Sequence, residues 1–181
     1  MIDKDKELIS HLKTEGKREM AFQLLVKTYQ ERLYWHIRKI VVSHDDADDL
    51  MQNVFIKVWK NIDRFREDSS LFTWLFRIAT NESLSFLQQK KRRNIFSIEG
   101  VSDYLAETFE SDAHFEGEEL QKRLQLAVLK LPEKQRIVFN MKYYDEMKYE
   151  EIADILNTSV GALKASYHHA VKKIEAHFEG E

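Results

Sequence analysis

Apolar side chains recur every three or four residues along most of this 181-residue chain, the spacing that gathers them on one side of an α-helix. The chain has only 5 glycines and 1 proline, too few for the many tight turns of an all-β fold, and it is rich in helix-favouring residues. The sequence therefore predicts an all-α protein.

The spacing also predicts individual helices in the first half of the chain. Residues 21–41 form one long amphipathic helix or two joined end to end. An acid-rich start at 45–49, favoured by the helix dipole, opens a helix that extends to Ile62. After a polar loop, Ser70 is placed to cap a helix over 71–87 that runs into the basic cluster 90–93. Trp35, Trp59 and Trp74 are expected in the core.

The second half ends in a helix-turn-helix pattern. An amphipathic helix over 120–131 stops at Pro132, which can open the next helix. Helices over 149–156 and 160–176 follow, separated only by residues 157–159, with Ser159 as the N-cap of the second. On the outward face of that second helix the side chains are small near the start and basic towards the end, so the face can lie close against DNA.

Charge divides the chain into three parts. Residues 1–93 carry 18 Lys and Arg against 14 Asp and Glu, residues 94–119 carry 8 acids and no base, and residues 120–181 carry 10 bases against 9 acids. Such an acidic stretch with scattered apolar residues cannot bury much surface, although its aromatics suggest that parts of it dock. We expect two small helical domains, 1–93 and 120–181, joined by an acidic linker, 94–119.

Several classes of protein are excluded. The chain has no cysteine, no long uncharged apolar run and no signal peptide, so we expect a cytosolic protein without disulfides. It has no phosphate-binding glycine loop, nucleophile elbow or thiol nucleophile, so we expect no enzyme. The acids at 45–49 and the pair His168 and His169 lack metal-site spacing, so we expect no metal and no cofactor.

A helix-turn-helix alone leaves alternatives open. The chain could be a regulator that binds an operator without any polymerase, and it should then bind duplex DNA tightly by itself. It could also be a helical adaptor that binds only protein.

The motifs together resemble one family. Residues 45–59, DDADDLMQNVFIKVW, and 72–81, FTWLFRIATN, resemble the second conserved domain of extracytoplasmic-function (ECF) sigma factors of bacteria. Residues 131–136, LPEKQR, with 149–153, YEEIA, and 160–164, VGALK, resemble their fourth domain. The resemblance spans nearly the whole chain in the expected order. It implies a factor that directs core RNA polymerase to minus-thirty-five and minus-ten promoter elements.

The resemblance also implies site residues. The clamp helices of the largest polymerase subunit would contact Asp49, Gln52, Asn53, Lys57 and Lys60, with Phe55 and Trp59 holding that helix. The minus-ten element would be opened and held by Arg64, Phe65, Arg66, Ser69, Ser70 and Asn81, with Lys90, Lys91, Arg92 and Arg93 along the backbone. The minus-thirty-five element would meet Ser159, Lys164, Ser166, His169, Lys172 and Lys173.

Three further expectations accompany the resemblance. An anti-sigma factor is an expected partner. The acidic linker either covers the basic faces by resembling DNA phosphates or threads into the RNA exit path of polymerase. Many relatives have Arg where Ser166 and His169 stand, so reading of guanine by a bidentate Arg is weakened here.

Overall fold

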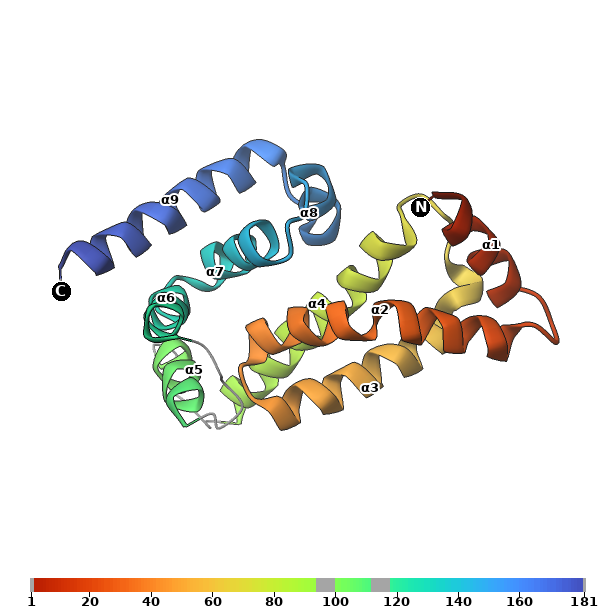
Figure 1. Ribbon diagram of the computed structural model, residues 1–181, viewed down its shortest axis with the longest axis horizontal. Helices are drawn as coiled ribbons and strands as arrows, with labels where there is room; N and C mark the ends of the chain where they lie inside the picture. The colour runs from red at the N-terminus through yellow and green to blue at the C-terminus, as the bar shows by residue number, and fades with distance from the viewer. Residues whose placement is uncertain (1, 94–99, 112–117, 181) are drawn as a thin grey trace.

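The computed structural model describes residues 2–93, 100–111 and 118–180, and every regular element in that part of the chain is helical (Figure 1). The all-α prediction is confirmed. In chain order the elements are α1 (Ile2–Leu12), α2 (Arg18–Val41), α3 (His44–Asn61), the 3₁₀ turn η1 (Ile62–Arg64), α4 (Leu71–Arg92), α5 (Val101–Glu110), α6 (Glu119–Leu129), α7 (Glu133–Phe139), the π-helical turn η2 (Asn140–Tyr144), α8 (Tyr149–Leu156) and α9 (Val160–Glu179).

Helices α1 to α4 form an N-terminal lobe in which α2 packs against both α3 and α4. Residues 18–41 make one continuous helix, which decides between the two arrangements that the spacing allowed. Trp59 and Trp74 are half-buried, but Trp35 is 51% exposed, so the prediction that it lies in the core is wrong. Trp35 lies on the face of α2 opposite the buried stripe of Leu25, Leu33 and Ile37.

Serine caps fix where three helices begin. Ser70 accepts a hydrogen bond from the Thr73 amide at the start of α4, and Ser159 accepts one from the Ala162 amide at the start of α9, as the sequence predicted. Ser43 caps α3 in the same way. Because a side-chain oxygen satisfies an otherwise unpaired amide, each cap stabilises its helix by about 1 kcal/mol.

Helices α6 to α9 form the C-terminal lobe, and α8 and α9 make the predicted helix-turn-helix. The turn between them depends on Asn157, which has a left-handed backbone with φ of 50°. Helix α8 begins at Tyr149, where the Lys148 amide donates to the Glu151 carboxylate over 2.8 Å. Leu163, Ala170 and Ile174 form the buried side of α9.

The acidic segment 94–119 contains a helix that the sequence did not predict. Residues 94–99 and 112–117 lie outside the described residues, but α5 between them is ordered beside α6, at the end of the molecule opposite α1 (Figure 1). Leu105 is fully buried and Phe109 is 5% exposed. The expectation that this segment buries little surface is therefore wrong for α5, because Leu105 and Phe109, one helical turn apart, place their side chains on the same face. The expectation that parts of the segment dock is confirmed for α5.

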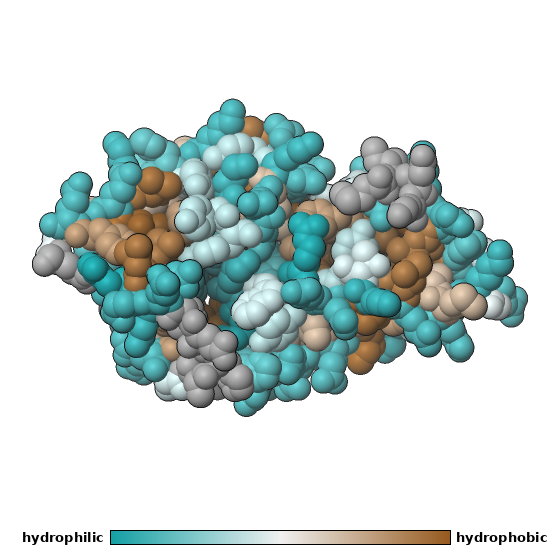
Figure 2. All heavy atoms as spheres, in the orientation of Figure 1, coloured by the Kyte–Doolittle hydropathy of each residue, from teal (hydrophilic) through white to brown (hydrophobic). Residues whose placement is uncertain are grey.

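The surface between the ends of the molecule is mostly hydrophilic. In the face drawn in Figure 2, apolar side chains gather between α6 and α9 at one end and near α1 and α2 at the other. Over the described ranges, no helix has the length and hydropathy to cross a membrane. Within the same ranges, no group of three or more His, Asp or Glu side chains could hold a metal ion.

Candidate nucleic-acid interface

The outer face of α3 carries the residues that the resemblance assigns to polymerase. Asp49, Gln52, Asn53 and Lys60 are exposed along it, and Ile56 among them is 50% exposed. The opposite side of the helix buries Leu50, Val54 and Val58 in the lobe. An exposed apolar side chain surrounded by polar ones suits a protein-binding surface.

The remaining residues assigned to α3 fix its position. Lys57 forms an ion pair with Glu82 of α4 and so ties the two helices together on the surface. The ring of Phe22 from α2 lies 6.2 Å from Phe55 and 5.0 Å from Trp59, both edge-on. Phe55 and Trp59 therefore anchor α3 to α2, the packing expected of them.

The loop from Arg64 to Ser70 leads into α4 and forms the first part of the expected minus-ten surface. Arg64, Arg66 and Ser70 are exposed, and Ser69 is half-buried. Phe65 is different: it is 4% exposed, and its ring lies 4.9 Å from that of Trp74. In this structure Phe65 holds the loop against α4 and does not face solvent, where it could stack on a base.

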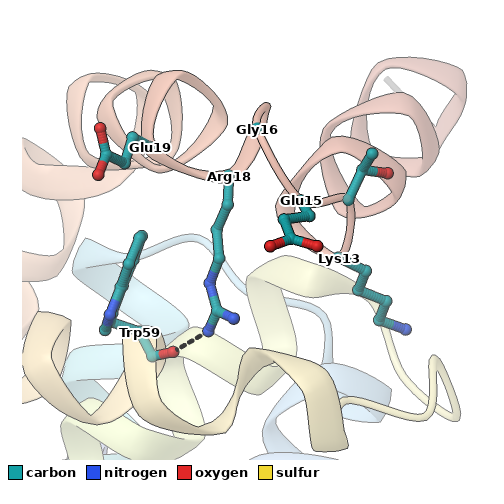
Figure 3. A pocket seen from close by; sticks show the side chains of 7 residues that line it. Lys13, Glu15, Gly16, Arg18, Glu19 and Trp59 are labelled. Atoms are coloured by element: carbon teal, nitrogen blue, oxygen red, sulfur yellow. Dashed lines mark hydrogen bonds between the residues drawn. The ribbon is translucent and has the colours of Figure 1, made fainter.

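Lys13 and Arg18, at the turn between α1 and α2, contact this loop and the residues just before it. Lys13 donates a hydrogen bond to the Phe65 carbonyl over 2.8 Å and pairs with Glu67. The Arg18 guanidinium lies 4.6 Å above the Trp59 ring, donates to the Trp59 carbonyl over 2.6 Å and pairs with Asp63, in the pocket of Figure 3. Sequence reasoning missed Lys13 and Arg18, since nothing in the sequence connects them to residues more than 40 positions away.

Helix α4 carries the other residues assigned to minus-ten DNA. Asn81 is exposed on it, and Lys91, Arg92 and Arg93 are at least partly exposed at its end. Lys90 is held inward: its ammonium group donates to Asp46 over 2.6 Å and to the Tyr104 hydroxyl of α5 over 2.9 Å. Burial alone would lower the pKa of Lys90, but these two hydrogen bonds outweigh it and raise the pKa above the ordinary value. Lys91, Arg92 and Arg93 are therefore the three basic residues of the cluster that are placed to contact a phosphate backbone.

The outward face of α9 carries the residues expected to meet minus-thirty-five DNA. Ser159, Lys164, His169, Lys172 and Lys173 are exposed on it. Ser166 is half-buried in a groove that also contains Leu84 of α4. The face therefore combines small side chains at its N-terminal end with exposed cations further along, as a helix in the major groove requires.

Comparison with protein families identifies both lobes. Residues 25–93 match Sigma-70 region 2, and residues 121–174 match Sigma-70 region 4. The chain is 33% identical over 156 residues to the ECF RNA polymerase sigma factor SigW of Bacillus subtilis, covering 82% of this chain and 83% of that protein. It is 33% identical over 167 residues to the ECF RNA polymerase sigma-E factor of Escherichia coli K12, covering 87% and 86%.

Solved structures share the fold at lower identity. CnrH, in complex with the cytosolic domain of CnrY, superposes with a TM-score of 0.71 at 22% identity over 98% of both chains. The sigma factor RpoE of Bartonella quintana, in complex with the anti-sigma factor NepR, gives 0.70 at 23% identity, covering 87% of this chain and 96% of that one. With region 2 in the N-terminal lobe and region 4 in the C-terminal lobe, the chain belongs to the ECF RNA polymerase sigma factors, which direct RNA polymerase to promoters and are not enzymes.

Proposed function

We propose that this sigma factor divides its work between three segments: residues 1–93 bind core polymerase and the minus-ten element, residues 120–181 bind the minus-thirty-five element, and residues 94–119 connect them. The observation that carries the proposal is the pair of exposed polar faces on α3 and α9, each on a helix whose other side is buried in its own lobe. Two weak DNA-binding modules held on one polymerase act together through effective concentration.

The outer face of α3 is the proposed polymerase surface. Asp49, Gln52 and Asn53 present carboxylate and amide groups beside the exposed Ile56, and Lys60 continues the face towards the end of the helix. The clamp helices of the largest subunit would lie along this face. Lys57 borders it and, through its ion pair with Glu82, also holds α3 on α4.

The loop 64–70 and α4 are the proposed minus-ten surface. Arg64, Arg66 and Ser69 would contact the strand, Ser70 fixes the start of α4, and Asn81 would hold an extruded base. Phe65 is assigned here a positioning role, since its ring packs on Trp74. Lys91, Arg92 and Arg93 would follow the phosphates, and Lys90 could join them only after leaving Asp46 and Tyr104.

The face of α9 is the proposed minus-thirty-five surface. Ser159, Lys164 and Ser166 lie in its first two turns, and His169, Lys172 and Lys173 continue it. Without an arginine at 166 or 169, recognition of guanine through paired hydrogen bonds is weaker, and phosphate contacts carry a larger share of the affinity.

The proposed setting is the cytoplasm, where RNA polymerase acts, and an anti-sigma factor is the proposed regulator. Regulation by an anti-sigma factor is supported by the two structural neighbours, one solved with the anti-sigma factor NepR and one with the cytosolic domain of CnrY.

In vitro transcription with core polymerase tests these assignments. The double change Asp49→Ala with Gln52→Ala should lower affinity for core polymerase, and Asn81→Ala should leave that affinity intact but reduce permanganate reactivity of unpaired thymines near minus ten. The matched controls are Glu175→Ala, an exposed acid on α9, and Gln89→Ala, an exposed amide on α4. Equal initiation by the test and control variants would show that the residue assignments are wrong.

A further inference from the structure

The two lobes are joined by a buried carboxylate. Asp145, which follows η2 in the C-terminal lobe, lies between two side chains of α2 in the N-terminal lobe. Its carboxylate is 2.7 Å from Nδ1 of His36 and 2.6 Å from Nζ of Lys39, and its side chain is only 7% exposed. Asn140 adds a hydrogen bond from its side-chain amide to the Lys39 carbonyl over 3.2 Å.

Both ring nitrogens of His36 have a partner. Its Nε2 lies 2.9 Å from the Thr80 hydroxyl, which also lies 2.7 Å from the Phe76 carbonyl, and its Nδ1 donates to the Asp145 carboxylate. Burial alone would raise the pKa of Asp145, but the hydrogen bond and charge of His36, followed by Lys39, lower it below the ordinary value. The Asp145 carboxylate is therefore held as an anion between a ring nitrogen of His36 and the Lys39 ammonium group.

Docking brings the two proposed DNA surfaces together. Helix α8 packs on α4 (Figure 1), and Arg77 and Asn81 of α4 share a pocket with Asp154 and Asn157. One turn further along α4, Leu84 shares a groove with Ala162 and Ser166 of α9. The middle of the proposed minus-ten surface and the start of the proposed minus-thirty-five face therefore lie against each other.

This arrangement cannot serve a promoter. Elements at minus ten and minus thirty-five are about 25 base pairs apart, which is roughly 85 Å of duplex at 3.4 Å per base pair. In the docked structure Asn81 and Ser166 line neighbouring pockets that share Leu84. The lobes must separate before both elements can be bound. The α3 face with Asp49, Gln52 and Asn53 is exposed while the lobes are docked, so polymerase has access to it first.

We propose that Asp145 is a latch that keeps the lobes of the free factor docked, so that the proposed minus-ten and minus-thirty-five surfaces lie too close together to bind both elements until the lobes are pulled apart on polymerase. The effect on DNA binding rests on the proposed DNA surfaces, whereas docking itself does not. Replacing Asp145 with Asn removes the negative charge that His36 and Lys39 face, so the docking equilibrium constant should fall about 100-fold or more.

Two measurements on the full chain test the latch. Because the chain has no cysteine, Glu7→Cys and Ala176→Cys place two dyes on exposed sites of the two lobes, and energy transfer reports their separation. Fluorescence anisotropy with a mixed-sequence duplex of about 30 base pairs, long enough for both DNA surfaces, reports whether the two lobes can bind DNA together. The control is Glu150→Gln, an exposed acid on α8 whose change alters the net charge equally.

The expected result is that Asp145→Asn changes the energy transfer and binds the duplex at least 10-fold more tightly than Glu150→Gln, because only the undocked fraction can place both surfaces on one duplex. Equal transfer in the two variants would overturn docking. Altered transfer with equal DNA affinity would overturn the inference that docking prevents the two surfaces from binding DNA together. If circular dichroism shows that Asp145→Asn is unfolded, Lys39→Met removes one arm of the latch and is judged by the same criteria. Initiation by the unlabelled wild type tests the proposed function separately.

Discussion

Replacing Leu105 by Ala tests whether the acidic segment is part of the folded structure. Leu105 is fully buried on α5, next to Phe109 and within the same apolar cluster as Leu87 and Leu129. Removing a buried leucine side chain costs its transfer free energy and leaves a cavity, together about 3 kcal/mol. For a protein of this size we expect the melting temperature to fall by roughly 6–12 °C.

The assay is urea denaturation followed by tryptophan fluorescence, with Glu107→Ala as the control on the exposed side of α5. The control should stay within about 0.5 kcal/mol of the wild type. Adding Phe109→Ala to Leu105→Ala should cost less than the two single changes together, because the loss is limited by the free energy with which α5 docks. Equal stability of Leu105→Ala and Glu107→Ala would refute the reasoning and make the segment a free tether.

Three other perturbations give separate tests. Ser159→Ala should lower the free energy of unfolding by about 1 kcal/mol through loss of the α9 cap, and Ser159→Asp should restore it in thermal melts. Lys172→Ala and Lys173→Ala should each flatten the salt dependence of duplex binding by about one unit per lost phosphate contact, and unchanged slopes would place these lysines away from DNA. The lowered pKa of Asp145 means that its contribution to docking is present above its undocked pKa of about 3.9 and is lost as the pH falls through the lower docked value. Energy transfer between the lobes during acid titration should follow that loss in the wild type and not in Asp145→Asn.

Features that depend on neighbours in sequence could be predicted. The apolar stripes of α2, α3, α4 and α9 follow from the 3.6-residue periodicity of the helix. The caps at Ser70 and Ser159 follow from the preference of helix starts for a side-chain oxygen. The turn between α8 and α9 was also predicted correctly. The helix α5 was missed because a run of acids masked a short apolar face, and the exposure of Trp35 was missed because residue type outweighed helical position in the prediction.

The sequence alone determined that this chain is helical, that it contains sigma-70 regions 2 and 4, and which faces of α3 and α9 are polar, since each of these depends on spacing within one segment. Only the tertiary structure decided that Asp145 lies between His36 and Lys39, more than 100 positions away, that Lys90 is held by Asp46 and Tyr104, and that Lys13 and Arg18 support the loop around Phe65. Periodicity fixes which way a side chain points from its helix, but which groups meet depends on how the helices pack, and that arrangement is set by the burial of all the apolar faces together.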